Sequence, residues 1–326
     1  MRLVAALTAL IIGSALAAPT RLAAQDANWP SRQLQIIVPL PAGSAADTVA
    51  RLIGQKLSER FNQSVIIINR DGASGATGSR EILKADPDGY TLGIATSTTL
   101  VTAPILNTKV GYDALKDFAP VAMVGFSPYV LVTHPGVPAK SVADYIKLAK
   151  SKPDTVTYSS VGEASLARLA AELLANMADI RIVQVPYKSS TQAIIDVLGG
   201  RVDSQFGILT TTHQYIREGK LNALGVTTPK RVAEFPDIPT IAESGLPGYE
   251  ASLWLGIVAP AKVPTEIVTK LNEAINEILK QPETRTALFN QAIVVDAMSA
   301  PAFAKHIDAD LKRWGSLAQK AGLIAR

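Results

Sequence analysis

The sequence predicts an α/β protein made of two consecutive series of strand–helix–strand units. Short apolar runs alternate with longer segments whose apolar residues recur every third or fourth position, the period of a helix packed on one face. Strands that are apolar on both faces are typical of parallel sheets covered by helices. A chain of 326 residues is long enough for one large domain or two modest ones, so each series can form a unit of its own.

The first segment has the pattern of an export signal. A positive start at Arg2 precedes an apolar run over residues 3–17, and small and polar residues follow. The run is shorter than the roughly 20 apolar residues of a spanning helix. Cleavage fits after Ala17 or Ala24; we expect it after Ala24, which removes residues 1–24. No later stretch is apolar enough to span a membrane, so we expect the mature chain in the periplasm of a Gram-negative bacterium.

The first series begins with a buried strand over residues 34–38. Apolar residues at offsets of 0, 3, 4, 8 and 12 then predict a helix ending near Phe61. A second strand is predicted over 65–68. The remaining elements of this series are a helix over 75–84, a turn over 86–89 and a strand over 91–95.

The second series begins near Tyr129 and ends near residue 227. Its strands are predicted over 129–133, 156–159, 182–185 and 221–227, and its helices over 141–150, 166–177 and 191–198. Residues 229–250 are rich in Pro and Gly and are predicted to cross back as an ordered segment. Three helices close the chain, over 267–279, from Pro282, and over 303–321. We expect hinges near 125–128 and 227–229.

The composition excludes several functions. Without cysteine there is no disulfide, Cys-ligated zinc site or thiol nucleophile, and the three histidines lie far apart in sequence. The formal charge falls from +4 to +2 when Arg2 and Arg21 leave with the signal, and no basic cluster favours nucleic acid. The glycine run over 72–78 lacks dinucleotide-binding spacing and predicts a turn and a helix start. We therefore expect no metal, no cofactor and no catalytic residue.

The turn after the first strand has the pattern of an anion-binding helix start. Gly43 permits a tight turn, Ser44 suits an N-cap, and Asp47 stands where a carboxylate reaches back to a backbone amide. Free amides and the helix dipole attract an anion there. The alternative is a capped helix without a ligand. The candidate ligand-binding residues of this turn are Leu40, Ala42, Gly43, Ser44, Ala45 and Asp47.

Other strand ends offer hydroxyl and amide groups at the same edge, where ligands bind in open α/β sheets. Neutral donors without a cluster of cations suit a small carboxylate better than a polyphosphate. Tyr187, which follows a strand, is a further candidate. The hydroxyl- and amide-bearing candidates are Thr96, Ser97 and Thr98 in the first series, and Ser159, Ser160, Val161, Gly162, Glu163, Ala164 and Ser165 in the second.

Eight stretches, in this order, resemble the Bug or TctC-like family, the substrate-binding components of tripartite tricarboxylate transporters. Two of them read Val185-Pro-Tyr-Lys188 and Leu198-Gly-Gly-Arg-Val-Asp203. The resemblance covers nearly the whole mature chain, from about Trp29 to the C-terminus. The eight stretches are residues 37–51, 69–78, 87–92, 185–188, 198–203, 219–224, 236–240 and 245–250.

The resemblance implies a two-lobed periplasmic-binding-protein (Venus flytrap) fold without catalytic activity, each lobe a mostly parallel sheet flanked by helices. Lobe one would comprise residues 25–125 with 229–326, and lobe two residues 126–228. Such a protein, which we expect to be a monomer, captures a small carboxylate between its lobes and presents it to the permease subunits of the membrane transporter. The turns over 40–47 and 159–165 would hold one carboxylate of the ligand.

Departures from the family pattern bear on the ligand. The usual Pro-Gly-Gly of the first turn is Ala-Gly-Ser at 42–44, and the usual Gly-x-Gly of the second is Gly-Glu-Ala at 162–164, where the glutamate opposes an anion. Gly207 replaces an Asp of many members, which favours a dicarboxylate or an aromatic carboxylate over an amino acid. Arg168, in place of a common His, fits either the cleft or the surface. A sensor that signals to a membrane receptor and an exported enzyme of small acids are the alternatives.

Overall fold

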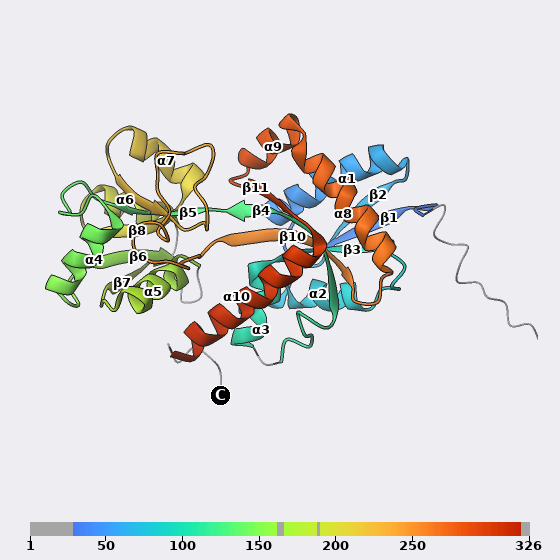
Figure 1. Cartoon of the computed structure of the whole chain (residues 1–326), viewed down its shortest axis with the longest axis horizontal. Helices are drawn as coiled ribbons and strands as arrows, with labels where there is room; N and C mark the ends of the chain where they lie inside the picture. Colours follow the sequence, from blue (N-terminus) through green and yellow to red (C-terminus); the bar gives the residue numbers. More distant parts are fainter. Residues whose placement is uncertain (1–28, 108, 162–165, 188–189, 321–326) are drawn as a thin grey trace, which may run out of the picture.

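The computed structural model describes residues 29–107, 109–161, 166–187 and 190–320, which fold into two α/β lobes joined by two long strands (Figure 1). The expected signal segment, residues 1–24, lies outside the described residues. No helix in the described part of the chain is both long and apolar enough to cross a membrane. The two-lobed α/β architecture that the family resemblance implies is therefore present.

Lobe one is built on a six-stranded sheet with the order β11-β4-β10-β3-β1-β2. Its strands are β1 (Leu34–Val38), β2 (Val65–Asn69), β3 (Thr91–Thr96), β4 (Phe118–Ser127), β10 (Leu253–Pro260) and β11 (Val294–Met298). Its helices are α1 (Ala45–Phe61), α2 (Ala76–Leu83), α3 (Ala103–Leu106), α8 (Thr265–Lys280), α9 (Pro282–Phe289) and α10 (Ala300–Lys320), with short helical turns η1 (Ala73–Gly75) and η2 (Thr98–Thr102).

Lobe two is built on a five-stranded sheet with the order β7-β6-β8-β5-β9. Its strands are β5 (Tyr129–Thr133), β6 (Thr157–Val161), β7 (Val183–Tyr187), β8 (Ser204–Ile208) and β9 (Asn222–Val226). Its helices are α4 (Val142–Ser151), α5 (Leu166–Ala178), α6 (Ser190–Leu198) and α7 (Leu209–Arg217).

The apolar periodicity of the sequence explains which helix faces are buried. In α1 the residues at helical spacing, Val49, Ile53 and Leu57, are fully buried and pack with β1 in one core cluster. In α5 the equivalent residues are Leu169, Leu173 and Leu174, which belong to a second cluster. These helices therefore sit where their stripes of apolar side chains cover a sheet.

Both sheets are mixed, which corrects the expectation of mostly parallel sheets. In lobe one β1 runs parallel to β2 and β3, but β10 runs antiparallel to β3 and β4, and β11 antiparallel to β4. In lobe two β6 runs parallel to β7 and β8, and β5 antiparallel to β8 and β9. The antiparallel members β4, β5, β9 and β10 are the strands next to the points where the chain passes between the lobes.

The segment over 229–250, assigned to lobe one in the sequence analysis, packs on lobe two instead. Its Val232, Phe235 and Ile238 share a core cluster with Val130 and Val132 of β5. Thr240 pairs with the end of β9 as well. The return to lobe one therefore occurs after Glu250, at the start of β10.

Thr227 is hydrogen-bonded to both segments that pass between the lobes, at Tyr129 and at Ala251. Its hydroxyl accepts a hydrogen bond from the Tyr129 amide (3.1 Å) and lies 3.2 Å from the Tyr129 carbonyl. Its own carbonyl accepts from the Ala251 amide (3.0 Å), and its side chain is fully buried. The hinge positions expected near 125–128 and 227–229 thus lie where three chain segments meet.

The first described residue, Trp29, is anchored at the edge of lobe one that lies away from lobe two. Its ring is 4% exposed and packs edge-on against Phe61 and Tyr90, and its Nε1 donates to the Asp88 carbonyl at 3.1 Å. The Lys270 ammonium donates to its carbonyl at 2.5 Å. Because Asp88 and Tyr90 directly precede β3, this anchor lies at the N-terminal ends of the parallel strands.

A buried charged group ties α10 to β10 and to the crossing segment. Asp310 is 1% exposed, accepts a hydrogen bond from Trp254 Nε1 at 2.7 Å and pairs with Arg313. Arg313 also pairs with Glu250 at 2.9 Å. Burial raises the pKa of the Asp310 carboxyl, and the charges of Arg313 and His306 counteract only part of that effect.

We expect Asp310→Ala to lower the free energy of unfolding by about 3–5 kcal/mol, because it leaves the buried Trp254 donor unpaired and removes one of the two acids that pair with Arg313. Urea unfolding at pH 7 measures the change. Asp308→Ala is the matched control: this exposed acid on the same helix pairs with Lys312 at 2.6 Å, and its loss should cost less than about 1 kcal/mol. Equal effects of the two substitutions would contradict a special role for the buried group.

Candidate functional site

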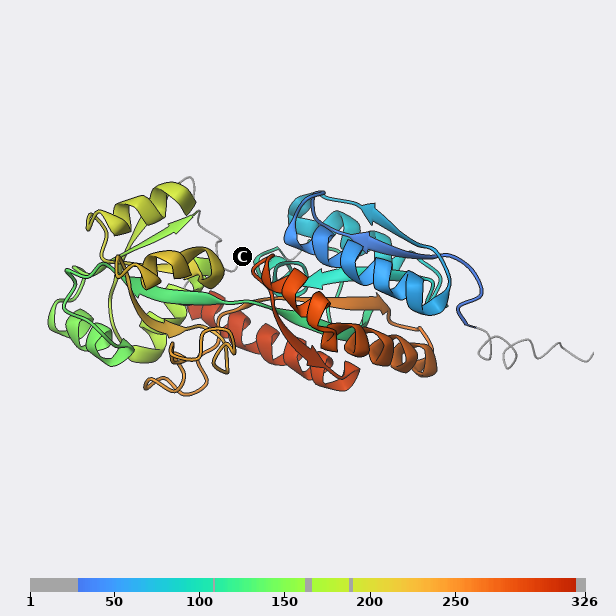
Figure 2. The same ribbon diagram turned by 90° about the horizontal axis from the view of Figure 1, so that it is seen from above.

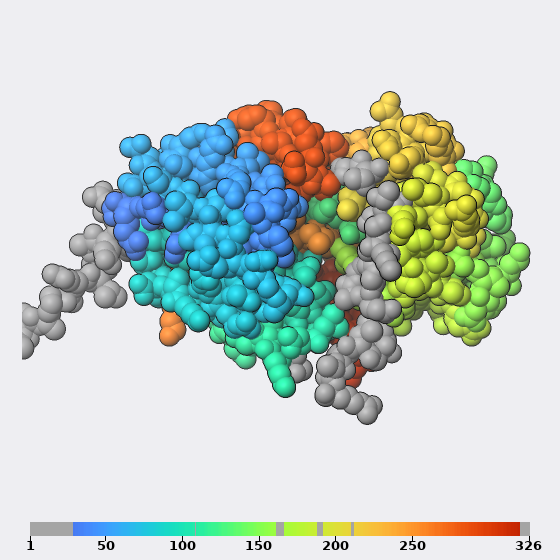
Figure 3. Space-filling model, turned by 180° about the vertical axis from the view of Figure 1, so that it is seen from behind, coloured from blue at the N-terminus to red at the C-terminus, as the bar shows by residue number. Residues whose placement is uncertain are grey.

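The strand ends that carry the candidate residues of both lobes converge on the joint. Thr96, at the end of β3, pairs with Leu255 of β10, two residues from the pairing of Leu253 with Ser127 that ends β4. In lobe two Ile208, at the end of β8, pairs with Tyr129, the first residue of β5. The carboxyl ends of β1–β3 and of β6–β8 therefore face the boundary between the lobes. Seen from above, the two lobes lie on either side of the crossing strands (Figure 2), and the space-filling view from behind is hollowed between them (Figure 3).

The first turn, residues 39–44, presents the N-terminus of α1 at this boundary. Ser44 is the N-cap, with extended backbone angles, and its hydroxyl accepts from the Asp47 amide at 3.3 Å. The Asp47 carboxylate accepts in return from the amide of Gly43, the residue before the N-cap, at 2.9 Å, an arrangement related to the capping box but shifted by one residue. Gly43 has φ of +82°, a conformation in which glycine is free of the strain that a side chain brings.

Asp47 holds the turn in place. Its side chain is buried, and it accepts hydrogen bonds from Arg51 Nε and Asn69 Nδ2, both at 3.0 Å, besides that from Gly43. Burial alone raises the pKa of the Asp47 carboxyl, but these donors and the charge of Arg51 outweigh it and hold the pKa below its ordinary value. Asp47 is therefore ionised and fully engaged within the turn.

Asn69, which the sequence analysis missed, completes this network from β2. Its Nδ2 also lies 3.3 Å from the Leu40 carbonyl, and its Oδ1 accepts from Arg51 at 3.4 Å. Asn69 therefore ties both ends of the first turn to the neighbouring strand. The signal available in the sequence was its position as the only polar residue at the end of an apolar strand.

Two amides at the start of α1 remain for a ligand. Of the first four N–H groups, that of Ser44 donates to the Pro41 carbonyl and that of Asp47 to Ser44 Oγ. Within the described residues, the amides of Ala45 and Ala46 have no such partner. Unpaired amides at a helix start, with the helix dipole behind them, are the kind of group that attracts an anion. Leu40 is half-buried and Ala42 exposed on the same turn.

The turn after β3 contributes hydroxyl groups next to this helix start. Thr96 and Thr99 cap each other: the amide of Thr96 donates to Thr99 Oγ1 at 2.9 Å, and the amide of Thr99 donates to Thr96 Oγ1 at 3.1 Å. Ser97 is buried beside them and Thr98 is half-buried, at the start of a π-helical turn. Thr96 is thus used in shaping the turn, and Ser97 and Thr98 follow it directly at the carboxyl end of β3.

The glycine run over 72–78 forms the turn and helix start that the sequence predicts, and it packs against the first turn. A Cβ on Gly78 would lie 2.5 Å from the Arg70 carbonyl oxygen and 2.6 Å from Pro39 Cα. The close approach of α2 to Pro39 therefore requires glycine at this position. These residues therefore support the first turn from behind.

In lobe two the described candidates Ser159 and Ser160 lie near the carboxyl end of β6. Ser159 and Ser160 are buried in β6, and Ser160 Oγ accepts from Gln184 Nε2 at 2.7 Å. Ser159 is paired in register with Gln205, and within the described residues neither Ser159 Oγ nor Gln205 Oε1 has a hydrogen-bond partner. Gln205 was not among the predicted residues. Val161 ends β6, and Gly162, Glu163, Ala164 and Ser165 lie outside the described residues.

Tyr187 and Gly207 take up other contacts. The Tyr187 hydroxyl donates to Asp196 of α6 at 2.7 Å, and burial together with that acid raises its pKa to about 12. A Cβ on Gly207 would lie 2.5 Å from Thr212 Oγ1, so this residue packs under α7. A residue larger than glycine at position 207 would require the Thr212 side chain to move.

Arg168 lies on α5, with its side chain 18% exposed and its Nε 3.9 Å from Glu172. Tyr158 donates to the same glutamate at 3.3 Å. The guanidinium is therefore largely buried beside an acid of its own helix, and a fully exposed surface position is ruled out.

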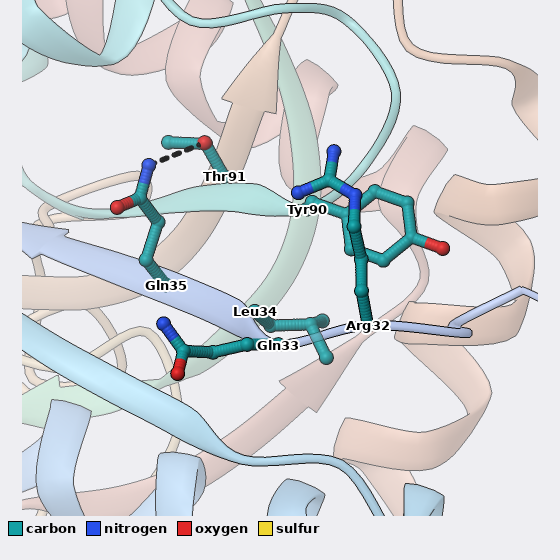
Figure 4. Close-up of a pocket in the computed structure, with 6 residues that line it drawn as sticks. All are labelled: Arg32, Gln33, Leu34, Gln35, Tyr90 and Thr91. Atoms are coloured by element: carbon teal, nitrogen blue, oxygen red, sulfur yellow. Dashed lines mark hydrogen bonds between the residues drawn. The ribbon is translucent and has the colours of Figure 1, made fainter.

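A small polar pocket lies at the opposite end of the lobe-one sheet. It is lined by Arg32, Gln33, Leu34, Gln35, Tyr90 and Thr91 (Figure 4). The Arg32 guanidinium stacks on Tyr90, 3.8 Å from the ring centroid, and pairs with Asp88 at 2.6 Å, and Gln35 Nε2 donates to Thr91 Oγ1. Because Arg32 is already paired with Asp88 and Gln35 with Thr91, the pocket is a less suitable anion site than the start of α1. Among the described residues, no three His, Asp or Glu side chains gather as a metal site would require.

The chain matches known proteins along most of its length. A family model described as "Tripartite tricarboxylate transporter family receptor" matches residues 49–323. The "UPF0065 protein in tcbD-tcbE intergenic region" of Pseudomonas sp. (strain P51) is 35% identical, over 94% of this chain and 92% of the relative. "Protein BugT" of Bordetella pertussis (strain Tohama I) is 33% identical over 98% of each chain.

Solved structures also match this chain over most of its length. A protein of R. palustris solved with adipate has a TM-score of 0.68 and 35% identity, over 90% of this chain and 98% of the other. MatC from Rhodopseudomonas palustris with bound malate has a TM-score of 0.64 and 29% identity, over 89% and 99%. A TctC solute-binding protein from Polaromonas without ligand has a TM-score of 0.83 and 25% identity, over 90% and 99%.

We expect Asp47→Asn to lower the free energy of unfolding by about 1–3 kcal/mol at pH 7, because the neutral amide pairs less well with Arg51 and with the donors of Gly43 and Asn69. The native pKa of Asp47 is lowered, so its contribution is present above about pH 4 and is lost as the pH falls through the native value. Urea unfolding at pH 7 and at pH 3 should therefore show a gap between wild type and variant that narrows in acid. Asp71→Asn, a change at an exposed acid nearby, serves as the control; a gap that does not depend on pH would contradict this role of Asp47.

Proposed function

The chain belongs to the tripartite tricarboxylate transporter receptor family, and on that premise we propose that it captures a small carboxylate between its two lobes in the periplasm and delivers it to a tripartite-type membrane transporter. The observation that carries this proposal is the start of α1 at the joint, with the Ala45 and Ala46 amides left for an anion. Relatives of the same architecture were solved with adipate and with malate. Members of this family are substrate-binding receptors, so capture without chemical change is proposed here.

The lobe-one surface favours a dicarboxylate or an aromatic carboxylate over an amino acid. An amino acid brings an ammonium group that needs an acid in the site. The acid of the first turn, Asp47, is already engaged with Gly43, Arg51 and Asn69. The other described groups at this edge are amides and the hydroxyls of Ser97 and Thr98, which suit carboxylate oxygens.

The second half of the site is proposed on lobe two. The end of β6, residues 159–161, faces the boundary from lobe two, and the rest of the predicted turn, residues 162–165, lies outside the described residues. Ser159 and Gln205 supply buried oxygen atoms there that have no partner within the described part of the chain. Residues in both lobes can contact the same ligand only when the lobes approach, so binding shifts an equilibrium between open and closed forms.

The comparisons support an open form for the structure described here. Its likeness to the ligand-free Polaromonas protein, with a TM-score of 0.83, exceeds its likeness to the adipate-bound protein, with 0.68. Sequence identity runs in the opposite order, 25% against 35%. A different relative placement of two otherwise similar lobes lowers a whole-chain likeness in this way.

We expect adipate, malate or an aromatic acid to raise the melting temperature of the mature protein, because a ligand that binds only the folded state stabilises it by about RT ln(1 + [L]/Kd). A thermal-shift screen of mono-, di- and tricarboxylates, aromatic acids and amino acids measures this. The acid that gives the largest shift should also reduce the radius of gyration of the protein in X-ray scattering, because the lobes close. The acid should be recovered from the protein chemically unchanged. A strongest shift with an amino acid would contradict the ligand class, and a converted acid would indicate an enzyme.

We expect Ala45→Pro to weaken binding of the acid that gives the largest shift about tenfold to hundredfold, because it removes one charge-assisted hydrogen bond of about 1.5–3 kcal/mol. Proline is favoured at the first helical position, and Ser44 before it already has ψ of 162° as proline requires, so the fold should stay intact. Calorimetric titration measures the affinity. Ala45→Gly keeps the amide and is the matched control; equal affinities of the two variants would place the ligand away from this amide.

A further inference from the structure

A crevice at the joint, on the opposite side of the crossing strands from the proposed ligand site, has walls from both lobes. We refer to it as the hinge crevice; it is lined by Phe126 of β4, residues 228–233, Arg285 of α9 and residues 294–296 of β11. In the lobe-one sheet β4 and β10 stand between β11 and the strands β3 and β1. The crevice and the ligand site are therefore separated by the strands about which the lobes move.

The two walls of the hinge crevice belong to different lobes. Phe126, Arg285 and residues 294–296 are parts of lobe one, where β11 pairs with β4. Residues 228–233 follow β9, and Val232 is packed in the core cluster of lobe two. A change in the angle between the lobes therefore changes the width of the crevice.

The lining of the hinge crevice is apolar at its base and positive at its rim. Phe126, Val232, Val294 and Val295 are buried or half-buried. Lys230 and Arg285 are exposed, and neither forms an ion pair with any described residue, whereas Arg231 is paired with Glu243. Asp296 is the acid of the lining. With two uncompensated cations against one acid, the crevice matches an anion that carries an apolar body.

We propose that the hinge crevice is a second binding site, for a small carboxylate with an apolar tail, and that its occupation opposes binding in the ligand site. The tail lies against Phe126 and the valines, and the carboxylate meets Lys230 and Arg285. Closure of the ligand site swings lobe two toward β1–β3 and moves residues 228–233 away from β11. A molecule that contacts both walls at the open width therefore stabilises the open form. This coupling rests on the function proposed above, whereas the crevice site itself does not.

Octanoate is the probe for the site. Calorimetric titration of the full mature protein should detect its binding, and the double variant Lys230→Gln with Arg285→Gln should lose most of that binding. Lys140→Gln with Lys305→Gln removes two exposed charges elsewhere and should leave it unchanged. Octanoate binding that is lost in Ala45→Pro but kept in the crevice variant would place the acid in the ligand site and overturn the proposal, as would the absence of any binding.

Adipate is the probe for the coupling. Saturating octanoate should raise the Kd of adipate by about fivefold or more, and the double crevice variant should abolish that rise. Binding of octanoate without any change in the adipate Kd overturns the coupling. A protein that binds octanoate at the crevice but no acid of the carboxylate panel would contradict the proposed function and leave the crevice site supported, so the two failures can be told apart.

Discussion

The structure of the candidate site depends on one buried carboxylate, Asp47, which is engaged entirely with its own turn. It holds the Gly43 amide, Arg51 and Asn69 at hydrogen-bond distance and so fixes the backbone over 39–47. An anion held by neutral amides gains affinity only if those amides already point the right way, because ordering them on binding costs conformational entropy. The negative charge of Asp47 would oppose the proposed anion only weakly, since Asp47 is paired with Arg51.

The interlobe joint imposes the second constraint. The chain crosses between the lobes next to Pro128 and returns near Ala251, and the buried hydrogen bonds of Thr227 bring these two crossings together. α10 lies against the same joint through Asp310 and Arg313, and its Trp314 and Leu317 share a core cluster with α5 of lobe two. The lobe movement proposed above would therefore be confined to a few backbone torsions at the crossings, that is, to a hinge motion.

Local sequence patterns predicted the helices and strands whose burial follows from their own apolar spacing. They missed the elements and roles that depend on contacts with distant parts of the chain. The helices over 45–61 and 166–178 and the capped turn at Ser44 follow from apolar spacing and capping chemistry. β11 is a half-buried edge strand without dense apolar sequence, and β4 is interrupted by Pro120 and Gly125, so neither shows a strand pattern. Residue spacing alone does not encode tertiary contacts. Such contacts set the direction of the strands, the hydrogen bond of Asn69 to Asp47 and the packing of Gly207 under α7.

The anchoring of Trp29 has a practical consequence. Because its ring is fixed between Phe61 and Tyr90 at the outer pole of lobe one, whatever is attached upstream of it leaves the molecule far from the moving boundary. A surface or a dye coupled there leaves the opening unobstructed and keeps one lobe stationary. If the lobes close on a ligand as proposed above, the swing of the other lobe becomes a signal that an attached reporter can read, as in an immobilised sensor.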